Sequence, residues 1–203
     1  MTWASFPLTL PLALLLPGAH PAQSVALACE PTGNRANLAT RASPYDSVTV
    51  EVGGRQAKIC YSRPSMRGRV ILGELVPYDT LWRTGANDPT ILHLPFPANL
   101  AGVALQPGKY SIYTIPGRER WTIVINASTT QGGLTRDEGQ FRNDYTEAVR
   151  AQEVARPTVN AETLEQPVEK FTIRSELRGE EADLVLEWER TRVRVPLRAR
   201  SAR

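Results

Sequence analysis

The chain has 203 residues, of which 41% are hydrophobic and 22% are charged. This is ordinary globular composition, and it excludes collagen-like, coiled-coil and wholly disordered proteins. The 24 basic and 21 acidic side chains leave a net charge of only +3, which gives no support for a nucleic-acid partner. A chain of this length can bury one hydrophobic core.

Residues 1–28 contain no charged side chain, and residues 3–16 (WASFPLTLPLALLL) form an apolar run. The run is shorter than the roughly 20 residues that span a membrane, and two prolines interrupt it, so no transmembrane span is expected. A short apolar stretch followed by a small-x-small site is typical of a secretory signal. Residues 26–28 (ALA) fit that site, and residues 22–24 (AQS) are a second candidate. The chain is therefore predicted to be exported to a periplasmic or extracellular location; a misassigned start or an apolar tail is the alternative.

The two cysteines, Cys29 and Cys60, both remain after cleavage behind Ala28. In an oxidising compartment such a pair predicts one disulfide. Cys29 also follows a small residue directly, as the lipidated cysteine of a lipoprotein does, so a lipid anchor at Cys29 is the competing interpretation. The two interpretations exclude each other, because a lipidated sulfur cannot also form a bridge. A third alternative is that Cys60 is only a small buried hydrophobe.

Alternating apolar and polar residues begin after a polar leader. Residues 47–52 (SVTVEV) have this period of two, Gly53-Gly54 predicts a hairpin turn, and residues 56–61 predict the returning strand. Residues 127–140 predict a long surface loop, and residues 144–150 allow one short helical turn. Further strands are expected at 90–96, 109–115, 121–126, 168–175, 184–188 and 192–198.

About ten short strands and little helix predict an all-β fold, a single-domain antiparallel sandwich or barrel-like sheet pair. The expected divisions are a signal segment (1–28), an N-terminal leader (29–45), the β-sandwich domain (46–198) and a basic tail (199–203). Pro196 predicts an edge position for the last strand. The alternating arginines near the C-terminus predict the solvated face of a strand.

Several short motifs are similar to those of one protein family. They are YSRPSMRGR at 61–69, VPY at 76–78, LWRTGAN at 81–87, and PGKYSIYTIPG at 107–117 ahead of WTI at 121–123. Together they resemble an exported bacterial family catalogued as domain of unknown function 2911.

The resemblance covers residues 44–198 and implies an exported β-rich domain, often with a lipoprotein signal, and no established activity. Members often carry Trp-Gly in the loop after the strand at 121–126, where this chain has Gly132-Gly133.

The motif region carries the best candidates for ligand binding, since guanidinium groups and aromatic faces suit a carboxylate, a phosphate or a sugar. The candidates are Tyr61, Arg63, Arg67, Arg69, Tyr78, Trp82, Arg83 and Asn87. The alternative is structural: the arginines satisfy loop carbonyls or pair with carboxylates while Trp82 fills the core. Adjacent side chains of an extended segment face opposite ways, so an inward Trp82 predicts that Arg83 faces outward or across the Gly85 turn, available to a ligand or to a nearby carboxylate.

Catalytic chemistry has weaker support. Of the two histidines, His20 lies in the predicted signal and His93 in an apolar strand, where a satisfied sheet-face histidine is favoured over a base. No Cys/His cluster has metal-ligand spacing and no glycine-rich phosphate loop is present, so neither a metal nor a cofactor is expected. Three carboxylates flank the motifs and would have to meet in space to act as acid and base: Glu74, Asp79 and Asp88.

The leading hypothesis is an exported or envelope-associated β-domain, a non-catalytic binding or structural module whose partner is a small anionic or sugar-like ligand. The alternative is a small carboxylate-dependent hydrolase or isomerase with its site near residues 61–88. Convergence of two carboxylates in a cleft would favour the enzyme, and separate pairing with arginines would favour the module.

Overall fold

The computed structural model describes Met1 and residues 27–31, 38, 40–130, 134–137, 140–143 and 145–201. Nearly all of the predicted export signal and the Gly132-Gly133 pair lie outside the described residues. In the part of the chain that is described, no helix has the length and apolar character needed to cross a membrane.

Over the described residues the fold is all-β, as predicted, with one short helix. The main sheet of this described part has ten strands in the order β1-β2-β3-β6-β7-β11-β12-β4-β5, with β10 beside β7, and β8 pairs with β9 in a separate hairpin. The first strands are β1 (Tyr45–Val52), β2 (Arg55–Ser62), β3 (Ile91–Leu94), β4 (Ala98–Leu100), β5 (Val103–Leu105), β6 (Gly108–Pro116) and β7 (Arg120–Asn126). The remaining elements are β8 (Leu134–Asp137), β9 (Gln140–Asn143), α1 (Glu147–Arg150), β10 (Glu153–Ala155), β11 (Thr158–Arg178) and β12 (Glu181–Ala199).

The β1–β2 hairpin forms for the reason that its sequence predicts. The valines of β1 alternate toward the core, and Val50 pairs with Ala57 in an antiparallel register. The turn between the strands has positive φ at both Gly53 and Gly54, +53° and +68°, a conformation that glycine adopts without steric cost.

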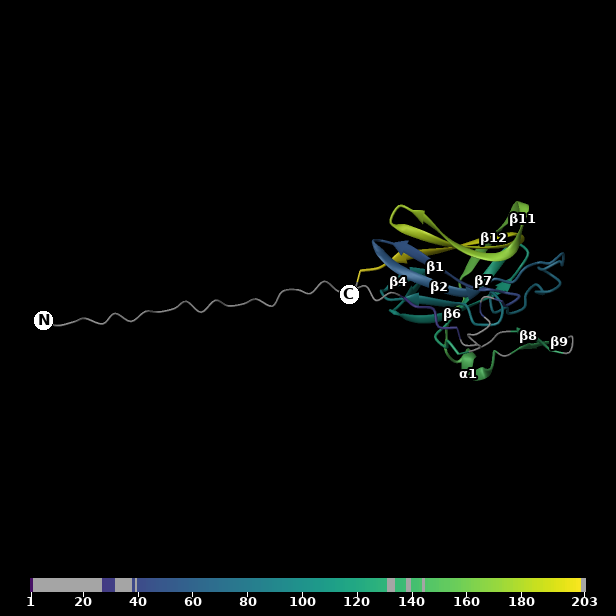
Figure 1. The fold of residues 1–203 in the computed structure, drawn as a ribbon, viewed down its shortest axis with the longest axis horizontal. Helices are drawn as coiled ribbons and strands as arrows, with labels where there is room; N and C mark the ends of the chain where they lie inside the picture. Colours follow the sequence, from purple (N-terminus) through teal and green to yellow (C-terminus); the bar gives the residue numbers. More distant parts are fainter. Residues whose placement is uncertain are drawn as a thin grey trace.

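The fold has two layers, one formed by β1, β2, β3, β6 and β7 and the other by β12, β4 and β5. The long strand β11 connects them. Its first residues pair with β7, Thr158 opposite Thr122, whereas the rest of the strand pairs with β12. The register of the second ladder shifts twice between Thr163 and Thr172, and such bulges bend a strand and increase its twist. The sheet therefore folds back on itself without closing, and the β11–β12 hairpin arches over β1 and β2 (Figure 1).

An aromatic cluster fills the space between the layers. The Trp82 ring stacks on Trp188, with centroids 5.4 Å apart, and meets Phe171 edge-on at 5.0 Å and Trp121 at 6.3 Å. The indole Nε1 of Trp82 donates a hydrogen bond to the carbonyl of Gly85, 3.1 Å away. Trp82 thus faces the core and has its one polar atom satisfied.

The outer face of β2, β3, β6 and β7 is covered by other parts of the chain. The predicted disulfide is present: Cys29 of the leader is bonded to Cys60 of β2, with Cα atoms 5.8 Å apart. A second, small apolar cluster joins Tyr113 and Val124 of the sheet to Tyr145 and Val149, which lie at and beside α1. Figure 1 shows α1 and the β8–β9 hairpin on the side opposite the β11–β12 hairpin.

Three sequence-based expectations about the strands need correction. β11 and β12 are 21 and 19 residues long, not short. The predicted loop at 127–140 contains β8 and the first residue of β9. Pro196 predicted an edge strand, but β12 lies between β11 and β4 in the sheet. The proline is tolerated because the ladder between β12 and β11 already ends at Val193, so its missing N–H breaks no bond of that ladder.

The arginines of β12 are not simply solvated. Arg192 pairs with Glu187 of the same strand and, across the hairpin, with Glu162 of β11. Arg194 pairs with Glu162 and Glu176 of β11. The register that places Glu162 opposite Arg192 is not shown by the sequence spacing alone.

Candidate functional site

The arginines of the motif region fix the long loop between β2 and β3. Arg63 donates from Nε to the carbonyl of Phe171 at 3.3 Å, from Nη2 to the Thr172 hydroxyl at 2.9 Å, and from Nη1 to Asp46 at 3.1 Å. All three nitrogens of this guanidinium therefore have partners within the protein.

Arg67 and Arg69 lie on the exposed surface and also bind backbone. Arg67 donates to the carbonyl of Ala42 at 3.2 Å, and Arg69 donates to the carbonyls of Ser65 and Met66, both at 2.8 Å. These contacts close the loop at residues 65–69 and do not converge on a shared space.

The two tyrosines of the motif region are packed. The Tyr61 hydroxyl donates to the carbonyl of Ile173 at 3.2 Å and accepts from the same residue's N–H at 2.9 Å. The Tyr78 ring lies under the guanidinium of Arg118, 4.5 Å from the ring centroid, and a Cβ at Gly73 would lie only 2.7 Å from it. Tyr61 joins the layers, and Tyr78 shapes a surface loop.

Arg83 is buried and reaches across the Gly85 turn, which is one of the two positions that the sequence allows. Only 8% of the residue is exposed, and its Nη1 donates to the carbonyl of Asn87 at 2.7 Å. The leader covers this region, because Asn87 donates to the carbonyl of Ser43 at 3.3 Å and Arg41 pairs with Asp88 at 2.6 Å. Strand alternation predicted the direction of Arg83 but not the segment that folds over it.

The three carboxylates near the motifs have different surroundings. Asp88 is buried and paired with Arg41, whereas Glu74 and Asp79 are exposed, and no hydrogen bond or ion pair among the described residues joins any two of them. Within the same described part of the chain, no group of three or more His, Cys, Asp or Glu side chains could hold a metal ion. The pairing of Asp88 with Arg41 is the arrangement expected of this carboxylate in a binding or structural module.

A different set of polar residues surrounds a small cavity on the outer face of the sheet. Strand ends, the leader and the loop after β7 enclose about 140 Å³. The lining residues are Glu30, Tyr45, Asp88, Pro89, Ile91, His93, Lys109, Thr129 and Thr130. We call this space the His93 cavity.

His93 is the buried titratable group of this cavity. It is 5% exposed and, as predicted, it lies on a sheet face, but it makes no hydrogen bond to another described residue. The register places Lys58 of β2 and Lys109 of β6 directly opposite it, on the same face. Burial and the positive charge of Lys109 lower the pKa of His93, so the imidazole is neutral near pH 7.

The cavity is also lined by two carboxylates and a phenol. Burial raises the pKa of Tyr45 to about 12, and the nearby carboxylates of Asp88 and Glu30 contribute. The Tyr45 hydroxyl therefore stays protonated and can donate a hydrogen bond. Glu30 pairs with Lys109 across the mouth of the cavity, with Nζ and Oε2 3.1 Å apart.

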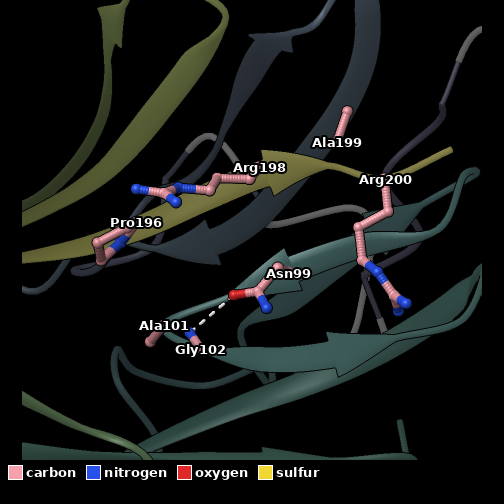
Figure 2. A pocket seen from close by; sticks show the side chains of 7 residues that line it. All are labelled: Asn99, Ala101, Gly102, Pro196, Arg198, Ala199 and Arg200. Atoms are coloured by element: carbon pink, nitrogen blue, oxygen red, sulfur yellow. Dashed lines mark hydrogen bonds between the residues drawn. The ribbon is translucent and has the colours of Figure 1, made fainter.

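A larger hollow of about 500 Å³ lies beside the β4–β5 turn (Figure 2). Its lining residues are Asn99, Ala101, Gly102, Pro196, Arg198, Ala199 and Arg200. Figure 2 shows the Arg198 and Arg200 guanidinium groups pointing in different directions and Asn99 turned toward Gly102, whose N–H it binds at 2.8 Å. The hollow contains no buried titratable side chain, so the smaller cavity is the better candidate.

Sequence reasoning missed the His93 cavity because its residues come from separate segments. Alternation in β3 places Ile91 and His93 on the face opposite Leu92, and alternation in β6 does the same for Lys109. Those two patterns were readable, but the register that pairs His93 with Lys109 was not.

These features define a class: a disulfide-bonded all-β domain with a small polar cavity on the outer face of its folded sheet. The family model for a protein of unknown function (DUF2911) matches residues 43–197. The chain belongs to this family. No curated protein and no solved structure matches it.

Proposed function

We propose that this protein is an exported, non-catalytic domain that binds a small anionic ligand in the His93 cavity. One observation carries the proposal: a buried histidine without a hydrogen-bond partner among the described residues faces a cavity and lies between two lysines. The chain has three lysines in all, so this placement uses most of them.

The chain itself supplies a carboxylate at the position where the ligand would bind. Glu30 forms an ion pair with the Lys109 ammonium, and the exposed fractions of the two side chains are 66% and 49%. Exposed ion pairs of this kind contribute little to stability, so an incoming anion can replace Glu30 at low cost. The neutral imidazole of His93 and the Tyr45 hydroxyl would then add hydrogen bonds to a carboxylate or hydroxyl group.

Two observations support export. The charge-free N-terminal segment has the character of a secretory signal, and the Cys29–Cys60 disulfide is the kind of crosslink that persists in oxidising compartments. Because a bridged Cys29 cannot carry a lipid, we favour a periplasmic or secreted form over an anchored one.

Ligand binding is tested by thermal unfolding of the purified protein with acetate, lactate, succinate or phosphate, and with glucose and glycerol as uncharged controls. A ligand at about 100 times its Kd adds about 2.7 kcal/mol, which should raise the Tm by roughly 5–10 °C for a chain of this size.

Lys109→Gln and His93→Gln should lose that increase while keeping the circular dichroism of the native sheet. Lys170→Gln is the matched control, because Lys170 is the one lysine that does not lie opposite His93. It should respond like the wild type. An equal response in Lys109→Gln and in the wild type would place the anion elsewhere. A response to glucose alone would favour a sugar-like ligand over an anionic one.

A further inference from the structure

The Cys29–Cys60 bridge joins the sheet beside the His93 cavity. Cys60 pairs with Ile91, and Lys58, two residues earlier on β2, pairs with His93. Since residues two apart on a strand share a face, the bridge and the His93 cavity lie on the same side of neighbouring strands. Ile91 itself lines the cavity.

The leader residue after the bridge reaches into this site. Glu30 lines the cavity and binds Lys109, so the start of the leader is held to the sheet by a covalent bond at Cys29 and by an ion pair at Glu30. The ionic contact is largely exposed and therefore weak alone. The covalent bond thus keeps Glu30 at a high local concentration beside Lys109.

We propose that residues 29–31 of the leader form a redox-controlled latch, in which the Cys29–Cys60 disulfide holds Glu30 on Lys109 and reduction releases these residues and opens the His93 cavity. This inference rests on the proposed function, because the site that the latch covers is the proposed anion site. Glu30 competes with the ligand for the same ammonium group.

The reductant is a dithiol of the thiol–disulfide exchange class. Its thiolate attacks the Sγ of Cys29, which is half-buried, whereas Cys60 is fully buried. A mixed disulfide forms on Cys29 while Cys60 leaves as a thiolate and takes up a proton. The second thiol of the reductant then attacks the mixed disulfide, so that the dithiol becomes a disulfide and both cysteines become thiols.

The latch is tested on the full chain by the rate at which diethyl pyrocarbonate acylates His93, measured by peptide mass spectrometry. The protein is used oxidised, or reduced with dithiothreitol and desalted under argon. Reduction should raise the rate by roughly an order of magnitude or more, because the covering segment can then open locally. Cys29→Ser without reductant should match the reduced wild type.

Matched variants separate the two attachments. Glu30→Gln keeps the disulfide and should give a smaller rise, together with tighter acetate binding than the wild type. Glu74→Gln removes an exposed carboxylate outside the cavity and should change neither measurement.

Amide exchange in β2, β3 and β6 shows whether the change is local. An unchanged His93 rate after complete reduction would overturn the latch, as would a rise accompanied by lost protection throughout these strands. A local rise without acetate binding in either redox state would support the latch while contradicting the proposed anion site.

Discussion

Replacing Trp82 with alanine tests the aromatic core that organises both layers. The ring is 6% exposed and contacts Trp121, Phe171 and Trp188. Truncating a buried tryptophan costs about 3–5 kcal/mol in unfolding free energy, and the carbonyl of Gly85 also loses its donor. For a chain of this length the Tm should fall by roughly 6–20 °C.

Urea unfolding, followed by circular dichroism, measures this loss. The unfolding free energies are compared between variants whose dependence on urea concentration has the same slope. Leu177→Ala is the control, because Leu177 is 62% exposed and its truncation should stay within about 0.5 kcal/mol. A loss below about 1 kcal/mol for Trp82→Ala would refute the reasoning, since it would mean that the ring is not tightly packed.

The remaining predictions concern acid stability, a buried arginine and export. Two arginines that bind Glu176 lower its pKa from 4.5 to about 2. The contribution of this carboxylate to the unfolding free energy is therefore complete above pH 4.5 and is lost as the pH falls toward 2. In Glu176→Gln the unfolding free energy should depend less on pH within this window. Arg83→Ala should cost about 1.5–3 kcal/mol in urea unfolding by removing the charged donor to Asn87, and an unchanged midpoint would argue against that burial. Protein purified from the native host should begin between Val25 and Cys29 by N-terminal sequencing; an intact Met1 would contradict export.

The sequence predicted the elements whose formation depends on neighbouring residues, such as hairpins and alternating strands. The hairpin at Gly53-Gly54 follows from alternation and from glycine's tolerance of positive φ. The disulfide was the leading one of three interpretations of the two cysteines, because an even pair in an exported chain favours a bridge. The first half of β11 was not predicted, because its residues are mostly polar and exposed and Pro167 interrupts it, so no alternating apolar signal exists.

The candidate site depends on contacts that sequence spacing does not encode. Single-residue register decides whether Lys109 lies beside His93 or faces away from it. The burial of Arg83 depends on the leader, which folds back to place Arg41 on Asp88. The motif arginines attracted attention by their composition, but the structure shows Arg63 bound to backbone and side-chain oxygens of its own chain.

The most direct test of anion binding is the NMR titration of the His93 imidazole with and without acetate. In the free protein, burial and the two neighbouring lysines hold the His93 pKa below its ordinary value of 6.5. In the proposed complex acetate replaces the Glu30 carboxylate on Lys109 and also accepts a hydrogen bond from the ring, which favours the charged imidazole. The His93 pKa should therefore rise, with a saturable change in its C2–H chemical shift that is absent in Lys109→Gln. A His93 titration that acetate leaves unchanged, in protein whose sheet remains folded, would contradict the account.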